Sequence, residues 1–151
     1  MIENQQTLTV SITVDDARAA LDFYEKALNA KIVSKFEMPD GTVAHADVMI
    51  GNTAVYVSGE FPDWNAFSPK TIGGSPNLLC ITEEDCDALF QQAIDAGGEI
   101  LSPMQDHVWG TRSGLFVDPF GYRWTIGKVI EKLTPEQLME RMSQMPPPDS
   151  E

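Results

Sequence analysis

The fold of this chain is decided by two stretches that follow one plan, TVSITVDDARAALDFYEKALNAKIV (residues 9–33) and NLLCITEEDCDALFQQAIDAGGEIL (residues 77–101). Thr9–Val14 corresponds to Asn77–Thr82 at an offset of 68 positions, and the acidic pair Asp15-Asp16 corresponds to Glu83-Glu84. Each stretch is typical of a strand, an acidic helix start, an amphipathic helix and a returning strand. A repeat of this length indicates a duplicated supersecondary unit. The alternative is a chance likeness of two βα segments, but order and spacing agree as well as composition.

Alternation and turn signals outside the two stretches complete each unit as βαβββ. Pro39-Asp40-Gly41 and Asp118-Pro119-Phe120-Gly121 are strong turn signals between alternating segments. We therefore predict an α+β fold of paired βαβββ modules, which form a curled mixed sheet (a cup) with the helices on its outer face. The expected organisation is a single domain over residues 1–151, with a first module at 7–58, a linker or lid loop at 59–76, a second module at 77–127 and a helical tail at 128–151.

The tail predicts a helix of its own. Thr134 and Gln137 have the spacing of a capping box, Pro135 occupies the favoured first helical position, and Pro146-Pro147-Pro148 ends the segment. The apolar side of this helix needs a surface to cover. Packing on its own domain and packing on a second subunit both remain open.

Charge and composition limit the partners. The chain of 151 residues has a formal net charge of −13, which disfavours nucleic acid and anionic membranes as partners. Its two cysteines, Cys80 and Cys86, lack the spacing of a metal or redox motif. No apolar run approaches the roughly 18 residues of a membrane span, and Met1–Gln6 contains no apolar export signal. We expect a cytoplasmic protein.

Strand alternation predicts which residues line the cup. The face expected under the helices carries mainly apolar residues, namely Val10, Ile12, Val14, Ala44, Ala46, Val48, Val55, Val57, Leu115 and Val117. The other face is expected to carry Thr9, Ser11, Thr13, His45, Asp47, Tyr56, Asn77, Arg112, Arg123 and Thr125. A polar face can be a solvated outer surface, but two paired modules favour a ligand cavity.

A few residues on the polar face are candidates for chemistry. His45 and Asp47 lie two apart on one strand, so Asp47 could orient His45 as an acid, a base or a ligand contact. The alternative is a histidine that only takes part in hydrogen bonds. Arg112 could grip an anionic or carbonyl group, or instead form an ion pair with Asp47 or Asp118.

Loop aromatics could close the cup. Trp64 and Trp109 could cap it and stack on an aromatic ligand, or they could pack at a dimer seam or against the tail helix, which we expect for Phe61 and Phe67. Trp124 alternates onto the helix-covered face and is expected in the core.

The motifs together resemble a known superfamily. They are Val14-Asp15-Asp16 with Phe23-Tyr24, Met38-Pro39-Asp40-Gly41, His45-Ala46-Asp47, Ser68–Pro76, Asp85–Ala88, Ala96-Gly97-Gly98, Trp109–Arg112 and Asp118–Trp124. In order and spacing the chain is similar to the vicinal oxygen chelate superfamily (glyoxalase, bleomycin-resistance protein, extradiol dioxygenase), and to its glyoxalase-like branch related to phosphonate-operon and demethylubiquinone-methyltransferase-like proteins. The resemblance covers about Thr7 to Gly127, and it implies the paired modules and a homodimer.

The resemblance also implies where a metal would bind in metal-dependent members. A histidine on the first strand of each module corresponds to Thr9 and to Asn77, or to Leu78 with a one-residue slip. A glutamate on the last strand of each module corresponds to Tyr56 and Thr125. Hydroxyl and amide groups are poor ligands for divalent transition metals, so we predict no metal or other cofactor. A non-standard divalent site from His45, Asp47 and His107 is the alternative.

Three functions follow from these residues. The first is a metal-independent protein that binds a small, partly aromatic or cationic molecule through Thr9, Ser11, Tyr56, Trp64, Asn77, Trp109, Arg112 and Thr125. The second is a glyoxalase-like lyase or isomerase with His45 and Asp47 as catalytic residues. The third is a structural dimer with a filled, vestigial cup. Binding ranks first by a small margin.

Overall fold

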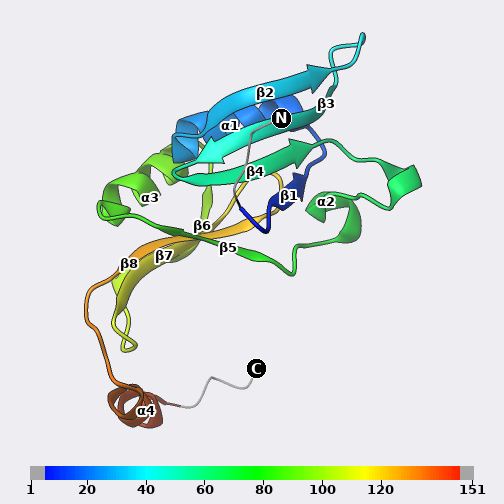
Figure 1. Ribbon diagram of the computed structural model, residues 1–151. Coiled ribbons are helices and arrows are strands. Elements are labelled where there is room, and N and C mark those ends of the chain that lie inside the picture. Colours follow the sequence, from blue (N-terminus) through cyan, green and yellow to red (C-terminus); the bar gives the residue numbers. More distant parts are fainter. Residues whose placement is uncertain (1–5, 147–151) are drawn as a thin grey trace.

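The computed structural model describes residues 6–146 and contains the two predicted βαβββ modules (Figure 1). The first contains β1 (Val10–Thr13), α1 (Ala17–Leu28), β2 (Lys31–Glu37), β3 (Val43–Ile50) and β4 (Thr53–Ser58), with the strand order β1-β4-β3-β2. The second contains β5 (Leu78–Thr82), α3 (Cys86–Asp95), β6 (Glu99–Asp106), β7 (Thr111–Val117) and β8 (Arg123–Val129), with the order β5-β8-β7-β6. The α+β class and the pairing of modules are confirmed. The two four-stranded sheets stay separate and no barrel closes among the described residues.

Residues 1–5 and 147–151, which include Pro147 and Pro148 of the predicted helix stop, lie outside the described residues. The region 59–76, expected as a linker or lid loop, contains a 3₁₀ turn, Pro62–Trp64, and a short helix, α2 (Pro69–Ile72). No helix within residues 6–146 has the length and apolar character needed to cross a membrane.

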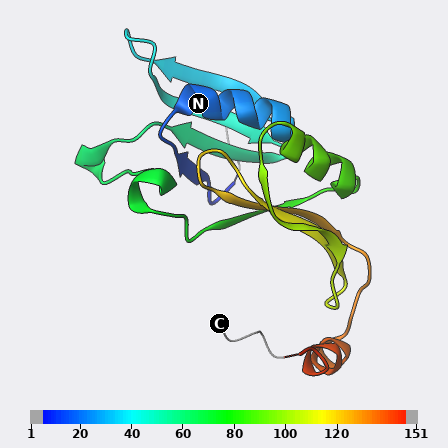
Figure 2. The same cartoon turned by 180° about the vertical axis from the view of Figure 1, so that it is seen from behind.

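Helix α1 is bounded at both ends by residues that favour helix termini. The Asp16 side chain accepts a hydrogen bond from the Ala19 amide at 3.0 Å, which satisfies one free donor of the first turn. Asn29 ends the helix in the left-handed conformation, with φ at 54°. The stripe between these caps packs on the first sheet, and α3 packs on the second. The two helices also contact each other, and Figure 2 shows them in succession across the back of the molecule.

A buried carboxylate joins the two modules. Asp118, in the turn between β7 and β8, accepts hydrogen bonds from the Tyr24 hydroxyl of α1 and from the Trp124 indole, both at 2.8 Å. The backbone amides of Phe120 and Tyr122 donate to its other oxygen at 2.9 Å. Burial nevertheless raises the pKa of Asp118. This turn therefore ties α1 of the first module to the sheet of the second.

Candidate functional site

The uncovered face of the first sheet carries a small polar cluster. His45 and Asp47 project from β3, and the His45 Nε2 atom lies 3.1 Å from an Asp47 oxygen. The Ser34 hydroxyl of β2 donates to the other Asp47 oxygen at 2.6 Å. Tyr56, the partner of Asp47 in the pairing of β3 with β4, places its ring 5.1 Å from the His45 ring. The three strands therefore bring the two predicted catalytic residues and Tyr56 together.

Asp47 supplies a buried negative charge to this cluster. Its side chain is only 2 % exposed, whereas that of His45 is 44 % exposed. The hydrogen bond from Ser34, together with the one from His45, lowers the pKa of Asp47 despite its burial. The cluster therefore offers an anion beneath a more exposed imidazole at neutral pH.

Hydroxyl groups continue this face onto β1. Ser11 is the strand partner of Tyr56, and Thr9 and Thr13 lie two residues before and after it. Ile12 and Val14 point to the other side and are fully buried. Val10 was expected under the helices, but it is 38 % exposed at the edge of the sheet, where α1 does not reach.

The uncovered face of the second sheet is more apolar. Thr125 of β8 lies beside Cys80 of β5 and Leu115 of β7. Leu115 and Val117 were predicted on the helix-covered face, and that prediction is wrong. Phe116 is fully buried, and a side chain at Gly114 would collide with the Phe90 ring of α3. Apolar residues on both faces of β7, with a glycine among them, conceal its alternation.

Arg112 consequently lies on the α3 side of β7 and not on the cup face. Its guanidinium donates to both Asp87 oxygens, at 2.8 and 2.6 Å, and to Asp106 at 2.9 Å. These carboxylates raise the pKa of Arg112. The two ion pairs occupy Arg112, so the prediction that it lines the cup is wrong, and its partners are neither Asp47 nor Asp118. The arginine on the uncovered face is Arg123, whose buried Nε has no partner among the described residues.

The remaining predicted ligand contacts are scattered. Trp109 stacks on His107 at 4.3 Å between ring centres in the turn after β6, and His107 lies 3.0 Å from the Ser113 hydroxyl. Trp64 is 81 % exposed beside Phe61 in the linker, so it does not fill the face of the first sheet. Asn77 is exposed just before β5.

The four positions implied for a metal do not fit one. In matching registers Ser11 pairs with Tyr56 and Cys80 pairs with Thr125, so Thr9 corresponds to Leu78 and not to Asn77. The ligand positions are therefore Thr9, Leu78, Tyr56 and Thr125, which provide three hydroxyl groups and an alkyl chain. Such donors lack the charge and basicity that divalent transition metals need. Within residues 6–146 no group of three His, Cys, Asp or Glu side chains is placed so that it could hold a metal ion.

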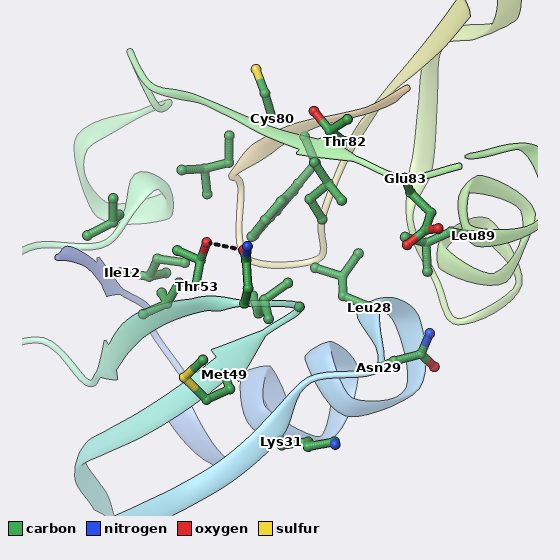
Figure 3. Close-up of a pocket in the computed structure, with 18 of the residues that line it drawn as sticks. Ile12, Leu28, Asn29, Lys31, Met49, Thr53, Cys80, Thr82, Glu83 and Leu89 are labelled. Atoms are coloured by element: carbon green, nitrogen blue, oxygen red, sulfur yellow. Dashed lines mark hydrogen bonds between the residues drawn. The ribbon is translucent and has the colours of Figure 1, made fainter. Parts of the chain in front are cut away.

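A cleft lies between the two modules, as the pairing of two similar units predicted. It has a volume of about 720 Å³ and lies between the edge strands β1 and β5 (Figure 3). Its walls are mostly apolar, with Ile12, Leu28 and Leu89 among them, while Asn29 and Glu83 add polar groups. None of the predicted catalytic or ligand-binding residues lines this cleft. Strand alternation did not indicate which residues line this cleft, because its two walls come from strands that are not hydrogen-bonded to each other.

Comparisons with known proteins agree with this architecture. An uncharacterised protein of Mycobacterium tuberculosis is 32 % identical over 145 residues, which cover 94 % of this chain and 85 % of the relative. TioX from Micromonospora sp. ML1 superposes with a TM-score of 0.66 at 23 % identity, over 82 % of this chain and 98 % of TioX. The fosfomycin resistance protein FosX from Listeria monocytogenes, whose structure contains Mn(II) and sulfate, gives a TM-score of 0.62 at 16 % identity over 94 % and 99 % of the two chains. These two solved structures share the fold.

The sequence model of one superfamily matches residues 6–126, which include both modules and the linker between them. The chain therefore belongs to the Glyoxalase/Bleomycin resistance protein/Dioxygenase superfamily.

Proposed function

We propose that this protein binds a small, partly aromatic or cationic molecule without a metal. The binding site is a cup formed by the uncovered face of the first sheet and the uncovered face of the second sheet. The observation that carries the proposal is the cluster on the first sheet, where buried Asp47 lies beside His45 and Tyr56. The positions that hold metal ligands in metal-dependent relatives offer only hydroxyl and alkyl groups here. A binding role needs no ligand set of that kind.

The chemistry of the two faces favours a ligand with two different ends. Asp47 provides a negative charge of low exposure, and the rings of Tyr56 and His45 provide aromatic surface that suits a cation or a flat ring. Leu115 and Thr125 of the second sheet provide an apolar surface with one hydroxyl. A ligand held between the faces would place its cationic or polar end at Asp47 and its apolar end at Leu115.

The proposed cup requires a second copy of the chain. Within one copy, α1 and α3 contact each other, and each sheet keeps its uncovered face on the side opposite its helix. Large apolar side chains remain exposed on the sheets, such as Phe36 at 62 % and Leu78 at 45 %. A homodimer that sets the first sheet of one copy opposite the second sheet of the other would cover them, and it would produce two equivalent cups.

Binding can be tested with a panel of cationic aromatic compounds in a thermal-shift assay, followed by calorimetry in the presence of a chelator. We expect at least one compound to raise the melting temperature and to bind equally well with EDTA. Asp47→Asn should weaken that binding by tenfold or more, whereas Asp22→Asn, an exposed site on α1, should leave it unchanged. A flat response across the panel would count against the binding role.

The second candidate is a lyase or isomerase of the glyoxalase type. The distance of 3.1 Å between His45 and Asp47 favours it, since a carboxylate that orients an imidazole is a common acid–base pair. Elemental analysis of the purified protein separates the two candidates. A stoichiometric divalent metal that is lost in His45→Ala would support the enzyme and overturn the metal-free proposal.

A further inference from the structure

Helix α4 (Pro135–Ser143) lies away from the rest of its own chain. None of its residues is buried, and Met139 and Met142 are 72 % and 52 % exposed. Figures 1 and 2 both show the helix separated from the two sheets, at the end of the segment that follows β8. Its own modules therefore do not cover its apolar side.

The position of α4 is nevertheless fixed. Arg141 donates to both Glu131 oxygens, at 2.8 and 2.7 Å, and to the Val108 carbonyl at 3.3 Å. The Ile130 and Glu131 amides both donate to the Gly110 carbonyl, at 2.9 and 3.0 Å. The helix is thus held out from the body by specific contacts.

The helix is also prepared to form at this place. Thr134 and Gln137 make the complete capping box, and Pro135 occupies the first turn. A helix of nine residues is marginal in water without a packed apolar face. Leu138 and Met139 lie four and three positions before Met142, so the three residues form one apolar side that needs a partner surface.

A matching uncovered surface lies in the first module. Phe36 is 62 % exposed on β2, opposite His45 in the strand pairing. In the second module the corresponding position is Gln105, which lies opposite Ser113. The exposed aromatic side chain at this position is therefore a feature of the first module alone. Met38 nearby is also 45 % exposed. In Figure 1 β2 lies at the top of the molecule and α4 at the bottom, so a chain cannot cover its own Phe36 with its own α4.

We propose that α4 of one copy packs over the Phe36 surface of a second copy, where Met139 and Met142 close the cup above His45 and Asp47. The role of this contact in closing a ligand site rests on the proposed function, whereas the contact between the two copies does not. Both surfaces belong to the same chain, so one two-fold arrangement uses each of them twice. In the proposed dimer the second sheet of one copy lies opposite the first sheet of the other. Helix α4 follows β8 of the second sheet, so this arrangement brings α4 to the rim of the cup, next to the first sheet of the partner copy.

Charge and side-chain chemistry agree with this occupant. The exposed acidic residues of α4 are Glu136 and Glu140, while the edge strand β2 exposes Lys31; Lys35 of the same strand is already paired with Glu37 at 2.7 Å. Methionine side chains are flexible and polarisable, so they can adapt to ligands of different shape and contact aromatic rings. The partner copy therefore contributes residues to a site that is open without it.

Cross-linking of two variants tests the contact without any ligand. In a Cys80→Ser background, in which Cys86 is buried, Met139→Cys and Phe36→Cys are made on separate chains, mixed and treated with a short bismaleimide. We expect a covalent dimer of the two chains in the mixture. Ile72→Cys, on an equally exposed residue in α2, replaces Phe36→Cys as the matched control and should give little product.

A second measurement uses the size of the protein in solution. Met139→Glu with Met142→Glu should weaken the dimer by tenfold or more in light scattering, while Met139→Leu with Met142→Leu should preserve it. The fold should survive both pairs of changes, because Met139 and Met142 are exposed and no residue of α4 is buried.

Three results would overturn the proposal. They are a mixture with no more cross-linked dimer than the control, a cross-link within one chain that carries both cysteines, and an unchanged dimer in the glutamate variant. Failure of the binding panel with a positive cross-link would instead reject the proposed function and keep the contact.

Discussion

The pKa values of two buried carboxylates in this protein are shifted in opposite directions, and their different surroundings explain why. Asp47 accepts hydrogen bonds from Ser34 and His45, and these lower its pKa more than burial raises it. Asp118 accepts four hydrogen bonds, yet the loss of solvation on burial outweighs them and raises its pKa. The first is therefore suited to hold a charge at a site, and the second to join parts of the structure.

Substitution of Asp118 should destabilise the whole molecule. Asp118→Ala leaves four donors without their acceptor, and we expect a loss of about 3–5 kcal/mol in the free energy of unfolding. Tyr24→Phe removes one donor and should cost about 1–2 kcal/mol. Urea unfolding measures both. Equal effects of the two changes would show that the backbone donors find other partners.

The pH dependence of the two residues should differ in sign. The stability that Asp47 contributes is present above its ordinary pKa and is lost as the pH falls through its lowered value. For Asp118 the folded state holds the proton more tightly, so stability decreases as the pH rises from the ordinary value through the raised one. Carbon-detected NMR of the carboxyl groups should find Asp47 below and Asp118 above about 3.9, the usual aspartate value.

Ser34→Ala provides the control for this titration. It removes the leading cause of the shift and should bring the pKa of Asp47 back toward the usual aspartate value, without moving that of Asp118. An unchanged Asp47 in this variant would assign the shift to other groups.

At the scale of elements, the sequence predicted most of the first module because its signals are local. Hydroxyl and apolar residues alternate strictly in β1, and α1 has a side-chain cap at one end and a left-handed asparagine at the other. Alternation on β3 and β4 placed His45, Asp47 and Tyr56 correctly on one face.

The residues of β7 were assigned to the wrong faces of the second sheet, although the sequence repeat predicts the observed assignment. The offset of 68 that relates the two helices also carries Asp47 to Leu115 and Ala44 to Arg112. Ala44 was expected under α1, so the same offset assigns Arg112 to the α3 side. Hydrophobicity of single residues favoured the opposite assignment. Long-range partners such as Asp87 carry no sequence signal, so the ion pair itself could not be foreseen.

Gly110 controls how α4 is attached, and its replacement should release the helix. It has φ at +86°, and a side chain there would collide with the Glu131 carbonyl oxygen. Gly110→Ala should cost about 1–3 kcal/mol. Hydrogen exchange at the Ile130 and Glu131 amides should also become much faster, because both donate to the Gly110 carbonyl.

Gly73→Ala is the matched control for this substitution. Gly73 has a similar φ of +91° but open space around it, so that variant should carry the conformational cost alone. Equal exchange of Ile130 and Glu131 in both variants would contradict the role of Gly110 as the attachment point.

At the scale of the molecule, the two modules differ in what their uncovered faces can do. The first sheet presents an anion, an imidazole and hydroxyl groups, whereas the second presents Leu115, Thr125 and the apolar edge of β5. Neither face surrounds a ligand alone, and helix contacts and the Asp118 hydrogen bonds hold them apart within one chain. The sequence predicted the composition of the first face. It could not predict that contacts between the two modules of one chain hold this face apart from the second.

Restoring metal ligands should test whether the two faces meet as proposed. Thr9→His, Leu78→His, Tyr56→Glu and Thr125→Glu together place two imidazoles and two carboxylates at the four positions that the strand registers equate. If the cup assembles between copies, the quadruple variant should bind Zn²⁺ or Mn²⁺ at one ion per chain. At 100 times the dissociation constant the metal should stabilise the variant by about 2.7 kcal/mol in thermal unfolding.

The variant with only Thr9→His and Tyr56→Glu supplies two ligands from one sheet, so it should bind the metal at least a hundredfold more weakly. The two variants differ only at residues of the second sheet. A tight site in the quadruple variant would therefore require that sheet to lie opposite the first, and its affinity should fall when the protein is diluted below the dimer concentration. If four ligands bind no better than two, the faces do not converge, and the cup on which the binding proposal depends does not form.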